Sequence, residues 1–198
     1  MVPTVEQHGF LEGEGDQQKT AREQRIARAK EKELMRSALC STARYGCYVF
    51  DELITEEAGI IDFLVVGPQD VSAIVVRSDR GYVSLVKERD LLLIDGERFE
   101  DDPYDQGRFL VRDVNTKVFD QTYSVKYLIC FLYAQLEIDE NRQIPSGTTP
   151  LWELPWALDP EGEENLTADI EEIAEKVQKV YGRPPIVTPQ KAGQEEGP

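Results

Sequence analysis

The chain has 198 residues, a hydrophobic fraction of 40% and a formal net charge of −16. Its length allows one domain with a sizeable core, and its polarity suits a globular middle with polar ends. The excess of acid argues against tight, non-specific binding of nucleic acid, which normally requires a basic face. No apolar run approaches the ~20 residues that span a bilayer, and the first 18 residues lack the features of a secretory signal. We therefore expect a cytoplasmic protein without a membrane partner.

Cysteine and histidine usage bears on metal and redox chemistry. The three cysteines are Cys40, Cys47 and Cys130, and they fall in or beside predicted apolar elements. Their odd number and this placement indicate reduced, partly buried thiols. The single histidine is His8, in a segment without periodicity, and Cys40 and Cys47 do not form a CxxC pair. The sequence therefore gives no support for a zinc site.

The first part of the chain is polar and helical. Residues 1–18 are rich in Gly, Glu and Gln and show no period, which predicts a disordered tail. Residues 20–39 are strong helix formers, and apolar positions become frequent only toward the end of this helix. Residues 1–36 contain seven acidic and seven basic side chains, so a solvated helix is favoured over an arm that binds nucleic acid. We expect a single domain over 19–182, with its core in 45–134.

Four strands separated by turn residues are predicted after this helix. The strands Ile60–Val66 and Val71–Arg77 are apolar on both faces, as central strands are when layers cover both sides. A further strand or hairpin follows, with its turn at Asp95 and Gly96. The remaining two predicted strands are Tyr48–Leu53 and Gly81–Val86.

Helices and one strand make up the second half. Apolar spacing predicts a helix over 104–120, despite Gly107, and a buried strand over 126–134. Residues 151–158 are apolar but interrupted by proline, which predicts an irregular strap over the core. The order of elements predicts an α/β fold in which a mixed central β-sheet is flanked by helices.

The clearest helix signal lies near the end of the chain. Residues 167–181 are predicted to form a helix whose apolar residues make one stripe. Thr167 is placed to cap the helix, and Gly182 followed by prolines ends it. Residues 183–198 are predicted to be a disordered tail.

Two charges stand out within these apolar strands. Asp62 is the lone acid in IIDFLVV, and Arg77 is the only charge in the next strand. A charge in such a position costs several kcal/mol unless it is paired or bound to a metal. Side chains alternate across a strand, so Asp62 and Arg77 are predicted to meet as neighbours on adjacent strands.

Around these residues the sequence resembles the nuclease-related domain family, of the PD-(D/E)XK type, whose fold is like that of restriction endonucleases. The family pattern is an Asp, an apolar strand, Gly-Pro, a strand ending in Glu-x-Lys, a Gly and a later Pro-x-x-Gln before a helix. The resemblance covers roughly residues 45–134, about half of the chain. It implies a restriction-endonuclease-like fold and a role with DNA. The matching positions are Asp62, Gly67, Pro68, Gly81, Pro103 and Gln106.

The chain departs from this pattern where the family binds metal. Val75 stands at the Glu position and Arg77 at the Lys position, so the resemblance implies a degenerate catalytic site in which Asp62 is the remaining metal ligand. Paired carboxylates would hold Mg²⁺, and a guanidinium that stays protonated cannot act as a base. The family's acid in the first helix has no clear match, with Glu31 and Glu33 as candidates. We therefore expect no cofactor, or Mg²⁺ if the protein is active.

Three readings of function follow. The favoured one is a non-catalytic nuclease-related domain that acts by binding nucleic acid or a protein. The second is an active Mg²⁺-dependent nuclease in which a relocated carboxylate replaces the lost ligand, the possible substitutes being Asp79, Glu88 and Asp90. The third is an acidic module that binds a basic protein surface without any nucleic-acid role.

Two further clusters of residues are predicted to have structural rather than functional roles. Trp152 and Trp156 flank a proline and are predicted to be core anchors rather than a platform on which bases stack. A group of acidic residues is predicted to be a solvated loop, and it consists of Glu97, Glu100, Asp101, Asp102 and Asp105.

Overall fold

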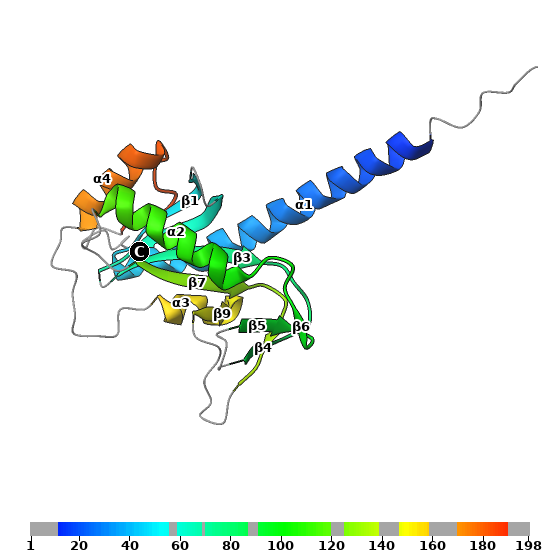
Figure 1. Ribbon diagram of the computed structural model, residues 1–198. Helices are drawn as coiled ribbons and strands as arrows, with labels where there is room; N and C mark the ends of the chain where they lie inside the picture. Colours follow the sequence, from blue (N-terminus) through cyan, green and yellow to red (C-terminus); the bar gives the residue numbers. More distant parts are fainter. Residues whose placement is uncertain are drawn as a thin grey trace, which may run out of the picture. The chain divides into compact units, whose positions relative to one another are not determined.

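The structure, a computed structural model, describes residues 12–55, 59–68, 70–86, 91–119, 125–138, 147–158 and 170–189. The chain divides into two units, Met1–Arg36 and Ser37–Pro198. Helix α1 (Glu12–Cys40) makes up the described part of the first unit, and its last turn belongs to the second (Figure 1). The helix therefore begins inside the segment 1–18 that was predicted to be disordered. Each residue added to an existing helix gains a backbone hydrogen bond, so the strong helix formers of 20–39 extend the helix back into this segment.

A five-stranded mixed sheet forms the centre of the second unit. Its order is β1-β2-β3-β7-β9, with β1, β2 and β3 antiparallel in a meander and β3, β7 and β9 parallel to one another. The strands predicted for β1, β2, β3 and β7 are present, whereas β9 was not predicted. Their bounds are Tyr48–Ile54 for β1, Ile60–Val66 for β2, Val71–Arg77 for β3, Val125–Phe131 for β7 and Thr148–Pro150 for β9.

A smaller sheet follows β3 in the chain. It has the order β6-β5-β4-β8 and consists of β4 (Tyr82–Val86), β5 (Leu91–Ile94), β6 (Glu97–Arg98) and β8 (Gln135–Leu136). The predicted turn at Asp95 and Gly96 joins β5 to β6, and both residues have positive φ, as the tightest hairpin turns require. The Asp95 carboxylate also accepts a hydrogen bond from the Tyr82 amide at 2.8 Å, which ties this turn back to β4.

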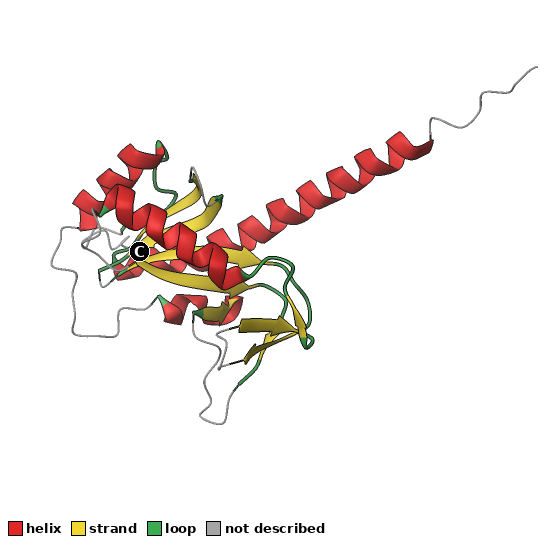
Figure 2. Cartoon of the chain, in the orientation of Figure 1, coloured by secondary structure: helices red, strands yellow, loops and turns green. Residues whose placement is uncertain are grey.

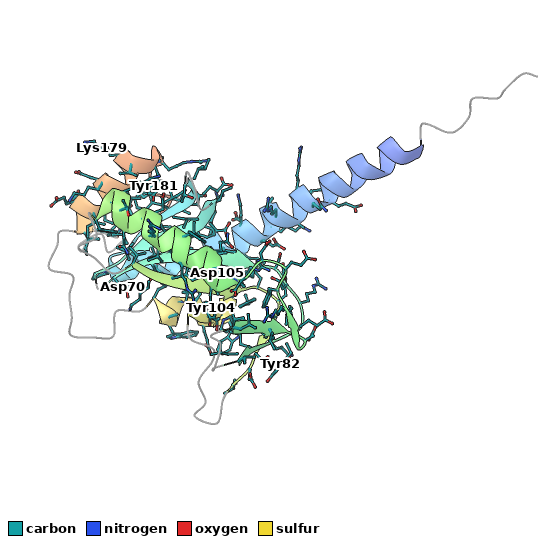
Figure 3. The ribbon with its side chains drawn as sticks, viewed as in Figure 1. Asp70, Tyr82, Tyr104, Asp105, Lys179 and Tyr181 are labelled. Atoms are coloured by element: carbon teal, nitrogen blue, oxygen red, sulfur yellow. The ribbon has the colours of Figure 1, made fainter. Side chains whose placement is uncertain are left out.

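Helices cover one face of the larger sheet (Figure 2). Helix α2 (Pro103–Val118) packs on β7 and β3, and α4 (Ile170–Tyr181) packs on β1, β2 and α2. The core under them contains Leu64, Ala73 and Val75 from the sheet, with Leu110 and Val177 from the two helices. Figure 3 shows Tyr181 beside α2, where its hydroxyl donates to the Asp113 carboxylate at 3.0 Å. This face holds a large apolar cluster, to which both helices and the sheet contribute.

The predicted α/β class is confirmed, with mixed sheets flanked by helices. The strap predicted over 151–158 begins with a 3-10 turn, η3 (Leu151–Glu153), and continues as the one-turn helix α3 (Leu154–Ala157). The 3-10 helix η1 (Ser41–Tyr45) follows α1. Thr167, the predicted cap of α4, lies outside the described residues. Within the described part of the chain, no helix combines the length and the apolarity that a membrane span requires.

Residues 183–189, which the sequence predicts to be part of a disordered tail, are ordered against β1. Gly182 ends α4 with φ of 68°, and the chain then returns along the edge of β1. There the Val49 amide donates to the Val187 carbonyl at 3.0 Å, and the Ile186 amide donates to the Val49 carbonyl at 2.7 Å. Val187 is buried. The segment 183–189 is therefore part of the fold, because β1 is an edge strand whose free backbone groups it satisfies.

Two truncations test this edge pairing. Ending the chain after Pro189 should leave the free energy of unfolding nearly unchanged. Ending it after Pro185 should lower that energy by about 1–3 kcal/mol, since it removes one buried aliphatic side chain and the backbone bonds to Val49. Urea unfolding curves of the two proteins measure the difference, and equal midpoints would show that the pairing contributes nothing to stability.

Candidate functional site

The sheet opens around Asp62. Pairing between β1 and β2 skips one row, the row of Glu52 and Asp62, and Glu52 has a φ of 50° that a residue with a side chain seldom adopts. Pairing between β2 and β3 ends at Phe63 and Ile74, so this ladder does not reach Asp62 either. Asp62 is thus the point at which the ladders on both of its sides are interrupted. Such interruptions concentrate at sites where a side chain is redirected.

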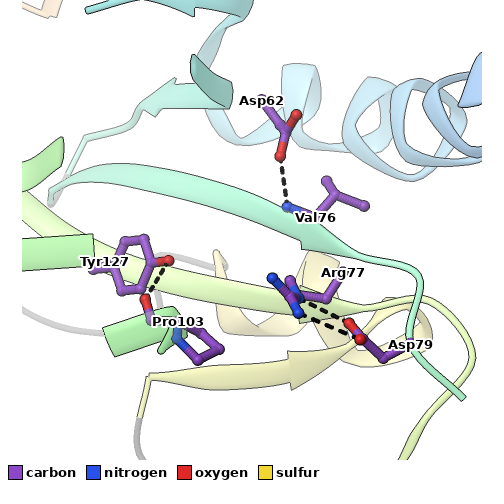
Figure 4. Close-up of polar contacts among 6 residues, drawn as sticks. All are labelled: Asp62, Val76, Arg77, Asp79, Pro103 and Tyr127. Atoms are coloured by element: carbon purple, nitrogen blue, oxygen red, sulfur yellow. Dashed lines mark hydrogen bonds and ion pairs between the residues drawn. The ribbon is translucent and has the colours of Figure 1, made fainter. Parts of the chain in front are cut away.

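The carboxylate of Asp62 fills the gap in the ladder. Its Oδ2 accepts a hydrogen bond from the Val76 amide at 2.8 Å (Figure 4). Where the strand pairing has stopped, this side chain satisfies an amide that the neighbouring strand would otherwise satisfy. Asp62 therefore has a structural role that its sequence pattern did not predict.

Arg77 pairs with a different acid from the one expected. Its Nε and Nη2 donate to the two carboxylate oxygens of Asp79 at 2.8 and 3.3 Å, and its Cζ lies 5.2 Å from the centre of the Phe99 ring. Figure 4 shows the guanidinium directed at Asp79, with no ion pair drawn to Asp62. The predicted Asp62–Arg77 pair is thus replaced by an Arg77–Asp79 pair. The reason is that strand alternation, on which the prediction rested, is interrupted at Asp62.

The position of the expected second metal ligand is apolar and covered. Val75 is 4% exposed and belongs to the core cluster under α2 and α4. Of the possible substitutes, Asp79 is held by Arg77, while Glu88 and Asp90 lie outside the described residues. Glu31 and Glu33, the candidate first-helix acids, lie on α1 in the first unit. No cluster of three or more His, Cys, Asp or Glu side chains suited to a metal occurs among the described residues.

This donor set does not fit Mg²⁺. One oxygen of Asp62 is engaged by a backbone amide, the neighbouring ligand position is a valine, and the nearby Arg77 is a fixed cation. Mg²⁺ prefers several oxygen ligands, and a guanidinium beside them opposes a second positive charge. We therefore derive no metal-dependent step from these residues.

Tyr127 links the site to α2 and was missed by the sequence reasoning. Its hydroxyl donates to the Pro103 carbonyl at 2.8 Å, and its ring lies where a Cβ on Gly107 would be. Burial raises the pKa of Tyr127 well above its ordinary range, and Asp62 and Asp102 add to this while Arg77 opposes it. Tyr127 is therefore neutral at physiological pH. A tyrosine within an apolar strand was the signal that could have drawn attention to it.

The positions shared with the family pattern have local structural roles. Gly67 makes the turn between β2 and β3, where its amide donates to the Asp70 carbonyl at 2.9 Å, and Pro68 follows it in that turn. Gly81 has a φ of 132° and lies against the Asp95 carboxylate, which leaves no room for a side chain. Pro103 begins α2 and Gln106 lies in its first turn. These residues determine turns and the start of a helix around the site, and they do not take part in chemistry.

The acidic cluster is only partly a solvated loop. The Asp102 carboxylate caps α2 by accepting a hydrogen bond from the Tyr104 amide at 2.9 Å. Asp105 is exposed in the first turn of α2, where Figure 3 labels it, and pairs with Arg108 at 3.1 Å. An acid at a helix amino terminus stabilises the helix through hydrogen bonding and the dipole.

The two tryptophans are not core anchors. Trp152 is 68% exposed and Trp156 is 66% exposed, while Leu154 between them is fully buried. The prediction that they anchor the core is therefore wrong. Leu154 holds the short strap to the protein, and the helical spacing of its neighbours turns both indole rings outward.

Comparisons with family models, with curated proteins and with solved structures found no match for this chain. The site is therefore interpreted from its own geometry. Asp62 is a hydrogen-bond acceptor within an opened sheet, Arg77 is a cation already paired and stacked on Phe99, and Tyr127 is neutral. These groups can bind and orient a ligand. Among the described residues of the site, no two groups are suited to exchanging a proton with a substrate.

The two roles considered for Asp62 predict different mutational results. Asp62→Asn keeps an oxygen that can accept from Val76, so stability should change little. Asp62→Ala should lower the free energy of unfolding by about 1.5–3 kcal/mol, because the Val76 amide loses a charged acceptor. Chemical denaturation of the two variants tests this. A large and equal loss in both would show that the negative charge, rather than the acceptor oxygen, is what matters.

Gly107→Ala provides a test of the contact between α2 and β7. Helix propensity alone predicts a gain of about 1 kcal/mol when alanine replaces a glycine inside a helix. We expect a loss of about 1–3 kcal/mol instead, because the new methyl group would overlap the Tyr127 ring. The variant Gly107→Ala with Tyr127→Leu should recover part of the loss, and failure of that recovery would place the conflict elsewhere.

Proposed function

We propose that this protein is a nuclease-related domain that does not cleave and that acts by binding nucleic acid. The observation on which this rests is Val75, buried where a metal-binding carboxylate would be needed beside Asp62. The sequence pattern Asp62, Gly67-Pro68, Gly81 and Pro103-x-x-Gln106 supports the relation to the family. The order of a strand meander, a crossover helix and a further parallel strand is compatible with a restriction-endonuclease-like fold.

The electrostatics of the site argue against metal-dependent catalysis. Arg77 is neutralised by Asp79, so it adds little net charge for polarising a phosphate. Its guanidinium cannot serve as a base because it stays protonated. A cleaving site of this type depends on a metal that generates hydroxide and stabilises the charge that develops at phosphorus. The residues described here supply neither the ligands nor a substitute general base.

A cleavage assay tests the absence of catalysis. We expect no hydrolysis of single-stranded or duplex DNA or RNA with Mg²⁺ or Mn²⁺ above the level of a protein-free control. Cleavage that disappears in Asp62→Ala would contradict the proposal and favour an active nuclease with a relocated carboxylate.

Restoring the family residues tests the same idea in the opposite direction. Val75→Glu places a carboxylate in a covered apolar position and should lower stability by several kcal/mol. If the surrounding frame is that of a metal site, Mn²⁺ should raise the melting temperature of Val75→Glu with Arg77→Lys while leaving the wild type and Val75→Gln unchanged. No difference among the three would remove the support for an ancestral metal site.

A further inference from the structure

Three parallel strands of the large sheet end at one row. Arg77 of β3 is paired with Phe131 of β7, and Phe131 is paired with Pro150 of β9. The residues that follow these strands therefore emerge together at one edge of the sheet. In open sheets with parallel strands, the edge formed by their carboxyl ends is the usual place for a ligand.

Aromatic side chains are exposed along this edge. Tyr133, two residues after β7, is 43% exposed, and Trp152, two residues after β9, is exposed like Trp156. Contacts between β8 and β9 bring the small sheet to the same region, where Figure 1 shows β9 and α3 beside β4 and β5. Tryptophan is usually well buried in folded proteins. Two exposed indoles on either side of the buried Leu154 therefore indicate a binding surface.

A cation accompanies these rings. The Arg80 guanidinium carbon lies 5.4 Å from the centre of the Tyr133 ring, and Arg80 is exposed. Arginine between exposed aromatic rings is the combination that proteins use to hold an unpaired strand, with bases stacked on the rings and a phosphate on the guanidinium.

We propose that this edge, defined by Arg80, Tyr133, Trp152 and Trp156, binds single-stranded nucleic acid by base stacking. This inference rests on the proposed function and specifies its substrate class. The net charge of −16 makes stacking, rather than phosphate neutralisation, the main attraction. Every base has a flat face, so the edge accepts unpaired DNA or RNA with little sequence preference. A duplex hides those faces and is excluded.

The intrinsic fluorescence of the tryptophans can report binding at this edge. It contains two tryptophans, and both belong to the edge. Adding a dT12 or U12 oligonucleotide at low salt should quench tryptophan emission, and a blunt duplex of the same length should not. With one neutralised phosphate, the slope of log K against log salt should be no steeper than about −1, since a single strand contributes ~0.7 for each phosphate.

Variants separate the edge from the rest of the surface. Trp152→Leu and Trp156→Leu should each weaken binding about 5- to 100-fold, as measured by anisotropy of a labelled dT12, because each removes one stacking partner. Arg80→Ala should weaken it less. Phe109→Leu is the matched control, because Phe109 is an exposed aromatic on α2, and it should leave the affinity unchanged. Thermal melts check that the variants remain folded.

The outcomes distinguish this inference from the proposed function. Duplex or single-strand binding that is unaffected in both tryptophan variants would overturn the stacking edge and leave nucleic-acid binding in place. No binding of any strand would overturn both proposals. Binding of labelled dT12 that is weakened in the tryptophan variants and kept in Phe109→Leu supports both.

Discussion

Parallel pairing of β3 with β7 requires the chain to cross from one end of the sheet to the other, and α2 makes that crossing. The helix lies close to β7 because Gly107 leaves space for the Tyr127 ring, whose hydroxyl bonds to the first turn of α2. This contact fixes the seven rows that pair β3 with β7, and β9 continues them. The ends of three strands coincide as a result, and both the Arg77 site and the aromatic edge are built from the residues that follow.

The interrupted strand pairing at Asp62 shows how a backbone amide helps to accommodate an acid in an apolar strand. The acid replaces a missing backbone acceptor, so its cost is offset by a hydrogen bond to Val76. Glu52, with its positive φ, lies in the same unpaired row of β1. The distortion is therefore shared by two strands and is a property of this part of the sheet rather than of one residue.

Charges near the site are largely compensated within the protein. Asp79 neutralises Arg77, Asp102 caps α2, and Asp70 pairs with Lys126 next to the turn at Gly67 and Pro68; Figure 3 labels Asp70. A strongly acidic chain in which Arg77 and Lys126 are paired offers little long-range attraction to a polyanion. The binding proposed for this edge would then depend on short-range contacts, which the exposed rings of Tyr133, Trp152 and Trp156 can supply.

The sequence by itself determined the types of the main elements, because hydrophobic period and turn residues are local signals. It placed β2 and β3 at their observed bounds, the hairpin turn at Asp95 and Gly96, and the apolar stripe of α4. It also marked Asp62 and Arg77 as the unusual charges. Their partners were decided only by the tertiary structure, since the loss of strand alternation at Asp62 depends on neighbouring strands. The same holds for Val187 on the edge of β1 and for the outward tryptophans: apolar residues predict burial, but whether a surface covers them depends on how distant segments pack.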